Sequence, residues 1–292
     1  MFANMCYDRT MKTYTETLNQ TQIKHLYTTY IEYLVDKEIP HVKFQIKLED
    51  CTITVYNSNK VVYQGLNPEK YLQNQSELDE EAGSDEVGTG DYFGPVVVCA
   101  AYLSKEEMIL AKELKVNDSK QISDEMIRKI APILMEKVKY SLLILDNVKY
   151  NKIHDSNNMN QIKARLHNQA YIHLKNKVGE LPKRCVVDQF TPENLYYNYI
   201  KHEPSIIKGL TFETKAESKY LSVAVASVIA RYAFLKSWDK MEEYYGLTIP
   251  KGAGNEVDHF GINFVKKYGM DELNKIAKLH FKNTSKIKEM MG

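Results

Sequence analysis

Two adjacent carboxylates, Asp85 and Glu86, are the residues of this sequence best placed to do chemistry. A turn with glycines at 88, 90 and 94 follows them, and Pro95 then opens a β-branched apolar run that ends at Leu103. Such a run predicts a buried strand, and the segment before Gly88 predicts its hairpin partner. Carboxylates at the rim of a buried hairpin lose hydration unless a cation or hydrogen-bond donors compensate. We therefore expect this pair to bind a ligand rather than to be incidental loop acids.

Two further acids stand where predicted elements end. Asp188 closes the apolar segment Cys185-Val-Val-Asp, and sites in α/β proteins form outside the carboxyl ends of strands. Glu217 precedes a long helical pattern. Each acid could instead have a purely structural role. Asp188 can begin a turn, and Glu217 completes Thr-x-x-Glu, the pattern of a helix capping box. No Cys or His cluster accompanies these acids in the sequence, and an all-oxygen ligand set suits Mg²⁺ or Mn²⁺ acting on phosphates.

Side-chain alternation sets a condition on the acid pair. In a regular strand Asp85 and Glu86 face opposite sides, so both reach one site only if the chain turns there, which Gly88 allows. His167 and His173 are six residues apart on a predicted helix. That spacing does not place them on one face, so we expect surface or core packing for both.

The elements after residue 82 alternate between strands and helices. After the hairpin, the patterns predict helices at residues 105–116, 123–137 and 157–177, and strands at residues 140–148, 185–188 and 205–212. A helix follows Glu217 and runs to about Tyr244, and two more helical patterns, at 257–268 and 271–279, precede a basic ending. This order predicts a mixed sheet flanked by helices.

The first part of the chain predicts a separate, smaller unit. Helical spacing covers residues 15–37, and alternating strands follow at 42–48, 51–56 and 60–64. Lys43, Lys47 and Lys60 fall on the polar face of these strands, which is either an ordinary solvated surface or a nucleic-acid docking surface. Residues 73–81 are polar and acidic and predict a linker. We therefore expect domains at residues 1–72 and 82–292.

Composition narrows the class of protein. Lys and Arg number 39 against 38 Asp and Glu, a net charge of +1, which argues against a charge-driven nucleic-acid coat protein but not against a local groove. Four widely spaced cysteines indicate neither a zinc site nor a disulfide framework. No apolar run approaches membrane-spanning length. We expect a cytoplasmic protein with no membrane partner, and a monomer by default.

Five motifs together resemble bacterial ribonuclease HIII, within the ribonuclease HII/HIII family. They are Asp85-Glu-Val-Gly-x-Gly-Asp-x-x-Gly-Pro-Val-Val, Asn117-Asp-Ser-Lys, Val187-Asp-Gln-Phe, Lys215-Ala-Glu-Ser with Ala-Ser-x-Ile-Ala-Arg231, and His280-Phe-Lys-Asn-Thr. Their order and approximate spacing resemble that family over residues 82–288. The N-terminal unit is similar, by position and pattern, to the family's extra substrate-binding domain, whose fold is like that of the TATA-binding protein.

The resemblance implies an α/β domain with an RNase H-like mixed sheet that hydrolyses the RNA strand of RNA–DNA hybrids and leaves 3′-hydroxyl and 5′-phosphate ends. It implies that two Mg²⁺ or Mn²⁺ ions, about 4 Å apart, act at the scissile phosphate. The implied catalytic and metal-binding residues are Asp85, Glu86, Asp188 and Glu217. The implied substrate contacts are Gly88, Thr89, Gly90, Ser119 and Lys120, although Lys120 could equally be a solvated loop lysine.

Two departures from the sister ribonuclease HII pattern favour HIII. Glu217 stands where HII proteins usually have Asp, and Thr89 stands where their glycine turn usually has a basic residue. Both put in doubt efficient incision at a single embedded ribonucleotide. The alternatives are such HII-like incision, a catalytically silent hybrid-binding module, or a two-metal nuclease that acts on DNA junctions.

Overall fold

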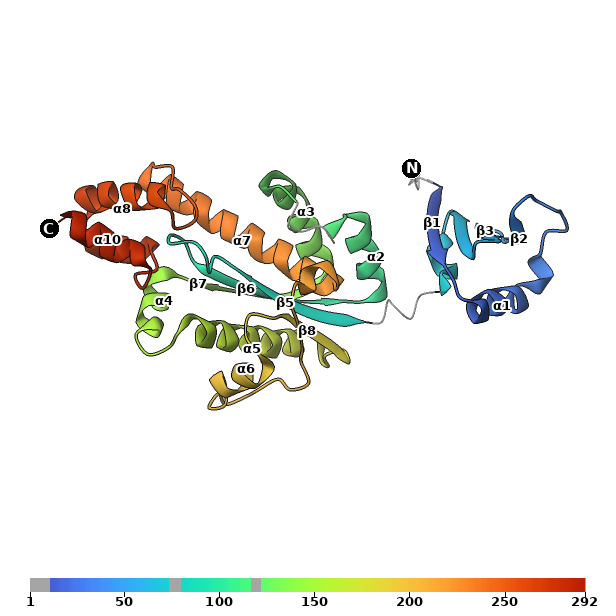
Figure 1. Ribbon diagram of the computed structural model, residues 1–292, viewed down its shortest axis with the longest axis horizontal. Coiled ribbons are helices and arrows are strands. Elements are labelled where there is room, and N and C mark those ends of the chain that lie inside the picture. The colour runs from blue at the N-terminus through green and yellow to red at the C-terminus, as the bar shows by residue number, and fades with distance from the viewer. Residues whose placement is uncertain (1–10, 74–79, 117–121, 292) are drawn as a thin grey trace, which may run out of the picture. The chain divides into compact units, whose positions relative to one another are not determined.

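The computed structural model describes residues 11–73, 80–116 and 122–291. It divides the chain into two compact units, Met1–Asp79 and Glu80–Gly292, each with its own sheet (Figure 1). Most of the predicted linker at residues 73–81 lies outside the described residues. Its last residue, Glu81, already begins the first strand of the second unit.

The first unit is a four-stranded antiparallel sheet with a helix on one face. The strands are β1 (Lys12–Thr17), β2 (Val42–Lys47), β3 (Cys51–Tyr56) and β4 (Lys60–Gly65), in the order β1-β4-β3-β2. The unit also contains α1 (Gln20–Thr29) and the short 3₁₀ helices η1 (Ile31–Tyr33) and η2 (Pro68–Tyr71). Its core joins Ile23 and Leu26 of α1 to Ile46, Ile53 and Val61 of the sheet.

The predicted helix at residues 15–37 is wrong at both ends. Residues Lys12–Thr17 form β1, which pairs with β4 over its whole length, and α1 is capped by Asn19, whose side chain accepts a hydrogen bond from Gln22 N. The alternation Lys-Thr-Tyr-Thr-Glu-Thr is compatible with a strand. The segment forms one because it pairs with β4, which is more than forty residues away in the chain.

The second unit is a mixed five-stranded sheet between helices. Its strands are β5 (Glu81–Val87), β6 (Val96–Leu103), β7 (Lys139–Leu145), β8 (Arg184–Asp188) and β9 (Thr211–Glu213), in the order β7-β6-β5-β8-β9. The helices are α2 (Lys105–Glu113), α3 (Asp124–Lys137), α4 (Asn147–His154), α5 (Met159–Val178), α6 (Glu193–Tyr199), α7 (Leu221–Tyr245), α8 (Asn255–Tyr268), α9 (Met270–Ile276) and α10 (Lys282–Met291). Figure 1 shows α7 on one face of this sheet and α5 on the other. The predicted fold class is confirmed.

The hairpin of β5 and β6 is the centre of the second unit. The two strands pair antiparallel from Glu81↔Leu103 to Val87↔Val97, and β8 pairs parallel with β5 on the side away from β6. Because β5 and β8 run in the same direction, their carboxyl ends lie at the same end of the sheet. Gly83 permits the contact of β5 with α7, because a Cβ there would lie 2.3 Å from Val223 N.

Helix α7 is long and apolar enough, by length and composition alone, to cross a membrane. The sequence-based expectation that no run approaches that length is thus wrong for this segment. However, 67% of its most apolar window is buried inside the structure. The small residues of the Val223–Ala230 stretch pack against β5 and β6, which is the packing of a core helix.

Several other predicted elements differ in extent. The strand predicted at residues 205–212 shrinks to β9, and residues 147–148, predicted as the end of a strand, begin α4. The basic ending of the chain contains a further helix, α10. The helix predicted from residue 123 begins there as α3, with Ser123 as its N-cap, since the Ser123 side chain accepts a hydrogen bond from Met126 N.

Candidate active site

Three of the predicted acids gather at the carboxyl ends of β5 and β8. These parallel strands pair as far as Ser84↔Val187, and the next residues along are Asp85 and Asp188. Asp85 is only 9% exposed. Burial raises the pKa of Asp85 to about 8, and the negative charges of Glu86 and Asp188 act in the same direction. The site therefore brings acidic groups close together out of water.

Asp85 and Glu86 face opposite sides of the sheet, because β5 stays regular through both residues. The side chain of Ser227, on α7, lowers the pKa of Asp85 by hydrogen bonding. Glu86 points to the α5 face, where its partners lie. The chain turns only at Gly88, whose φ is +90°. The sequence analysis required a turn at the two acids for both to reach one side, and the chain has no turn there. Asp85 and Glu86 instead lie on opposite faces of the sheet at the end of β5.

Glu86 is held by two cationic or donor groups of α5. Lys163 Nζ lies 2.8 Å from Oε1, and His167 Nε2 lies 2.8 Å from Oε2. Burial alone would raise the pKa of Glu86, but the hydrogen bond and charge of His167, together with Lys163, outweigh it and lower that pKa below its ordinary value. The pair of acids thus has opposite tendencies: Glu86 stays ionised while burial disfavours the charge of Asp85.

Asp188 and Glu217 are linked through a tight turn. Asp188 Oδ1 accepts a hydrogen bond from Ala216 N at 2.9 Å, and Lys215 takes a left-handed conformation with φ of +55°. The 3₁₀ helix η5 (Ala216–Ser218) that follows carries Glu217, which is 5% exposed. The capping-box interpretation of Glu217 is wrong, because α7 begins later, with Tyr220 at its N-cap. Asp188 does organise a turn, and it lies at the site as well.

The glycine turn after the acids is anchored by the C-terminal segment. Gly94 N donates to Ile276 O, and the fully buried Lys278 donates from Nζ to the carbonyls of Phe93 and Gly94, at 3.1 and 2.5 Å. Asn147 Nδ2 also donates to Gly94 O, at 2.9 Å. Within the turn, Gly88 is buried, Thr89 is half-buried and Gly90 is exposed. The other predicted substrate contacts, Ser119 and Lys120, lie outside the described residues.

His167 is fully buried, which agrees with the core packing that the sequence allowed. What the sequence did not indicate is its contact with Glu86. His173 is exposed and pairs with Gln169 on the same helix. The available signal was the spacing of Lys163 and His167, four residues apart and hence on one helical face.

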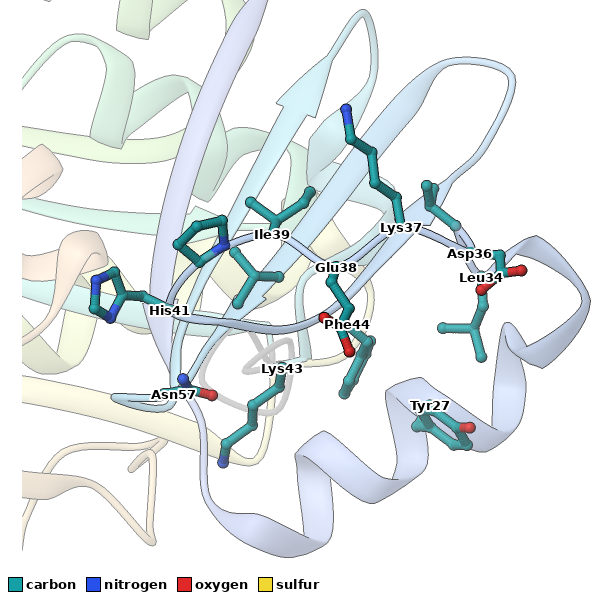
Figure 2. Close-up of a pocket in the computed structure, with 13 residues that line it drawn as sticks. Tyr27, Leu34, Asp36, Lys37, Glu38, Ile39, His41, Lys43, Phe44 and Asn57 are labelled. Carbon is teal, nitrogen blue, oxygen red and sulfur yellow. The ribbon is translucent and has the colours of Figure 1, made fainter.

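A large hollow of the described structure lies elsewhere, in the first unit. Its volume is about 780 Å³, and it lies between α1, β2 and the loop that joins η1 to β2. Figure 2 shows Tyr27, Phe44, Lys43 and Asn57 among the side chains that line it. None of the predicted catalytic or metal-binding residues is among them, although Lys43 belongs to the lysine face described from the sequence.

The carboxylates suit a hard divalent cation. Among the residues that the structure describes, no three His, Cys, Asp or Glu side chains are close enough to hold an ion by themselves. Mg²⁺, however, usually takes one or two protein carboxylates and completes its shell with water and substrate phosphate. A cation beside Asp85 would relieve the repulsion that Glu86 and Asp188 impose on it. The donor set therefore fits a metal that is shared with a phosphate.

Comparison with known proteins identifies the family. A protein-family model described as Ribonuclease HII matches residues 82–284. Ribonuclease HIII of Listeria monocytogenes serotype 4b (strain F2365) is 39% identical and aligns over 94% of this chain and 97% of its own length. The chain belongs to the ribonuclease HIII family. Ribonuclease HIII of Bacillus subtilis (strain 168) is 40% identical over 85% of this chain and 88% of its own length. A domain family of unknown function matches residues 16–84.

Solved structures agree with the ribonuclease HIII assignment. Bst-RNase HIII in complex with Mn²⁺ is 35% identical, with a TM-score of 0.71, and the match covers 96% of this chain and 99% of that one. Ribonuclease H3 of Aquifex aeolicus is 25% identical, with a TM-score of 0.58 and coverage of 92% and 100%. The family predicted from the five motifs is confirmed, and both solved relatives span both units.

Proposed function

We propose that this chain is an endoribonuclease that hydrolyses the RNA strand of RNA–DNA hybrids with the help of Mg²⁺ or Mn²⁺. The observation that carries the proposal is the meeting of Asp85, Glu86 and Asp188 at one sheet edge, in a chain of the ribonuclease HIII family. Glu217, brought up by the turn that Asp188 organises, completes the acidic set.

Each side chain has a distinct part in the proposed mechanism. Asp85 and Asp188 hold metal from the two adjacent strand ends, and Glu86 does so from the α5 face. Glu217 acts as a further ligand or positions the attacking water. When bound, the divalent ions lower the pKa of that water and neutralise charge on the leaving oxygen. The products are 3′-hydroxyl and 5′-phosphate ends.

Substrate recognition is proposed for the glycine turn and for the first unit. Backbone groups of Gly88, Thr89 and Gly90 lie directly after the acids. Their proposed part is to contact the RNA backbone and its 2′-hydroxyls, the groups that distinguish RNA from DNA. In the first unit, Lys47 and Lys60 are exposed and stand on the same sheet face as Thr52 and Thr54. This polar face can bind phosphates without reading sequence.

We further propose that the enzyme works in the cytoplasm as a monomer. Cys51, Cys99 and Cys185 are free and buried, which suits a reducing compartment. Sedimentation of the purified chain tests the monomer.

The proposal is tested by cleavage of three duplexes of one sequence in Mg²⁺ or Mn²⁺: an RNA–DNA hybrid, DNA with a single ribonucleotide, and all DNA. We expect cutting of the hybrid with 5′-phosphate products. Efficient cutting beside the single ribonucleotide would move the assignment toward HII-like incision despite Thr89. Binding of the hybrid without cutting in either metal would contradict the nuclease proposal and favour the alternative of a catalytically silent hybrid-binding module.

A further inference from the structure

His167 joins the acidic site to the interior of the second unit. It is fully buried, and both of its ring nitrogens have partners. Nε2 lies 2.8 Å from Glu86 Oε2, and Nδ1 lies 2.8 Å from Ser84 Oγ. Ser84 and Glu86 are two residues apart on β5, so they point to the same face of the sheet. One imidazole therefore spans both.

The direction of the hydrogen bond to Glu86 follows from the groups themselves. An ionised carboxylate only accepts, so Nε2 carries the hydrogen that points to Glu86. At Nδ1, the Ser84 hydroxyl donates to a neutral ring and accepts from a protonated one. In both cases Nε2 donates to Glu86, and the contact with Ser84 fixes the orientation of the ring.

Lys163 fixes the other oxygen of the same carboxylate. It precedes His167 by one helical turn, is 8% exposed, and places Nζ 2.8 Å from Glu86 Oε1. The same ammonium lies 4.0 Å from the centroid of the Phe190 ring, and that ring also lies 5.3 Å from the His167 ring. Phe190 follows Asp188 by two residues, so this cluster spans the ends of β5 and β8.

The Glu86 carboxylate can still bind a metal although both of its oxygens accept hydrogen bonds from α5. Each oxygen of Glu86 has two lone pairs, and Lys163 and His167 take one on each. The carboxylate can no longer rotate freely, but it keeps a lone pair for a cation. Outer partners that hydrogen-bond to metal ligands orient those ligands in just this manner.

We propose that Lys163 and His167 are positioning residues that hold the Glu86 carboxylate in its metal-binding orientation, with Ser84 fixing the orientation of the His167 ring. The proposal rests on the proposed function, in which Glu86 is a metal ligand. His167 acts through Glu86 and not on the substrate itself.

The test measures Mn²⁺ binding to the full-length protein without substrate, by titration calorimetry and by the electron paramagnetic resonance signal of free Mn²⁺. We expect His167→Phe to weaken binding about 10- to 100-fold, the usual cost of losing an outer partner of a metal ligand. His167→Gln keeps an amide donor and should recover part of that loss. The matched control is His173→Phe, on the same helix but exposed, which should bind Mn²⁺ as the unmodified protein does.

A double-mutant cycle separates positioning from a general loss of structure. In a Glu86→Gln background, His167→Phe should have no further effect on Mn²⁺ binding, because its action passes through Glu86. An equal loss in both backgrounds would overturn the proposal. If His167→Phe does not fold, Ser84→Ala replaces it, with an expected loss of about fivefold, the effect of one neutral hydrogen bond. Unchanged binding by Ser84→Ala would then overturn it.

The same experiment distinguishes this proposal from the function on which it rests. If Glu86→Gln alone binds Mn²⁺ as tightly as the unmodified protein, the metal role of Glu86 fails. If Glu86→Gln weakens binding while His167→Phe and Ser84→Ala do not, only the positioning role fails.

Discussion

The close approach of β5 to α7 should make Gly83 intolerant of any side chain. A Cβ at Gly83 would lie 2.3 Å from Val223 N and 2.6 Å from Ser222 C. Both atoms belong to the backbone of α7, so no side-chain rotation can relieve the overlap, and strand and helix must separate. Overpacking of this kind costs typically 1–3 kcal/mol and occasionally more, and we expect about 3 kcal/mol for Gly83→Ala.

The expected loss is measurable by thermal unfolding. For a domain the size of the second unit, about 3 kcal/mol lowers Tm by roughly 6–12 °C. Because Asp85 follows Gly83 by two residues on the same face of β5, separation from α7 should also misplace Asp85 and slow hybrid cleavage. The matched control is Gly90→Ala, where a Cβ meets no heavy atom within 4 Å, and its Tm should change by about 1 °C or less. A Gly83→Ala protein that melts within about 2 °C of the unmodified chain would refute the packing argument.

Three further predictions address the site, the anchored turn and the first unit. Asp85→Asn should keep its fold, as judged by circular dichroism, and lose more than about 100-fold in hybrid cleavage, because removing a ligand should cost more than removing an outer partner of a ligand; near-normal activity would contradict the metal assignment. Burial lowers the pKa of Lys278 to about 7, from an ordinary value of 10.5. Between these two pH values the lysine is protonated in the unfolded chain but not in the folded one, so the free energy of unfolding should rise with pH. Urea unfolding of Lys278→Met should lack that rise, and the same dependence on pH in both proteins would contradict the buried, neutral lysine. Replacing Lys47 and Lys60 by Ala should reduce the slope of log binding constant against log salt concentration by about 2, because each lysine that binds a phosphate contributes about 1 to that slope, and an unchanged slope would return that face to an ordinary surface.

The parts of the fold with local signals could be predicted from sequence. The β5–β6 hairpin follows from a β-branched run bounded by Gly and Pro, and Asp188 follows from its place at the end of an apolar strand. The limits of α5 were likewise close to the predicted range, because the apolar spacing and the capping residue Asn158 lie within the segment itself.

What could not be predicted depends on contacts that are distant in the chain. The strand β1 forms because it pairs with β4. The contact between His167 and Glu86 forms because α5 lies against the sheet beside Glu86, although the two residues are 81 positions apart in the chain. Lys278 binds the carbonyls of a turn 184 and 185 residues away. Helical and strand periodicities are local properties, so they place such residues on an element without revealing what that element packs against.

The central claim is the proposal that Asp85, with Glu86 or Asp188 beside it, binds the divalent metal used to cut RNA. The most direct measurement is a crystal structure of the protein soaked with Mn²⁺, with anomalous diffraction used to locate the ions. The account predicts an anomalous peak in coordination contact with Asp85 and at least one of Glu86 and Asp188. Strong peaks elsewhere, with none beside Asp85 in a protein that cleaves hybrid under the same conditions, would contradict it.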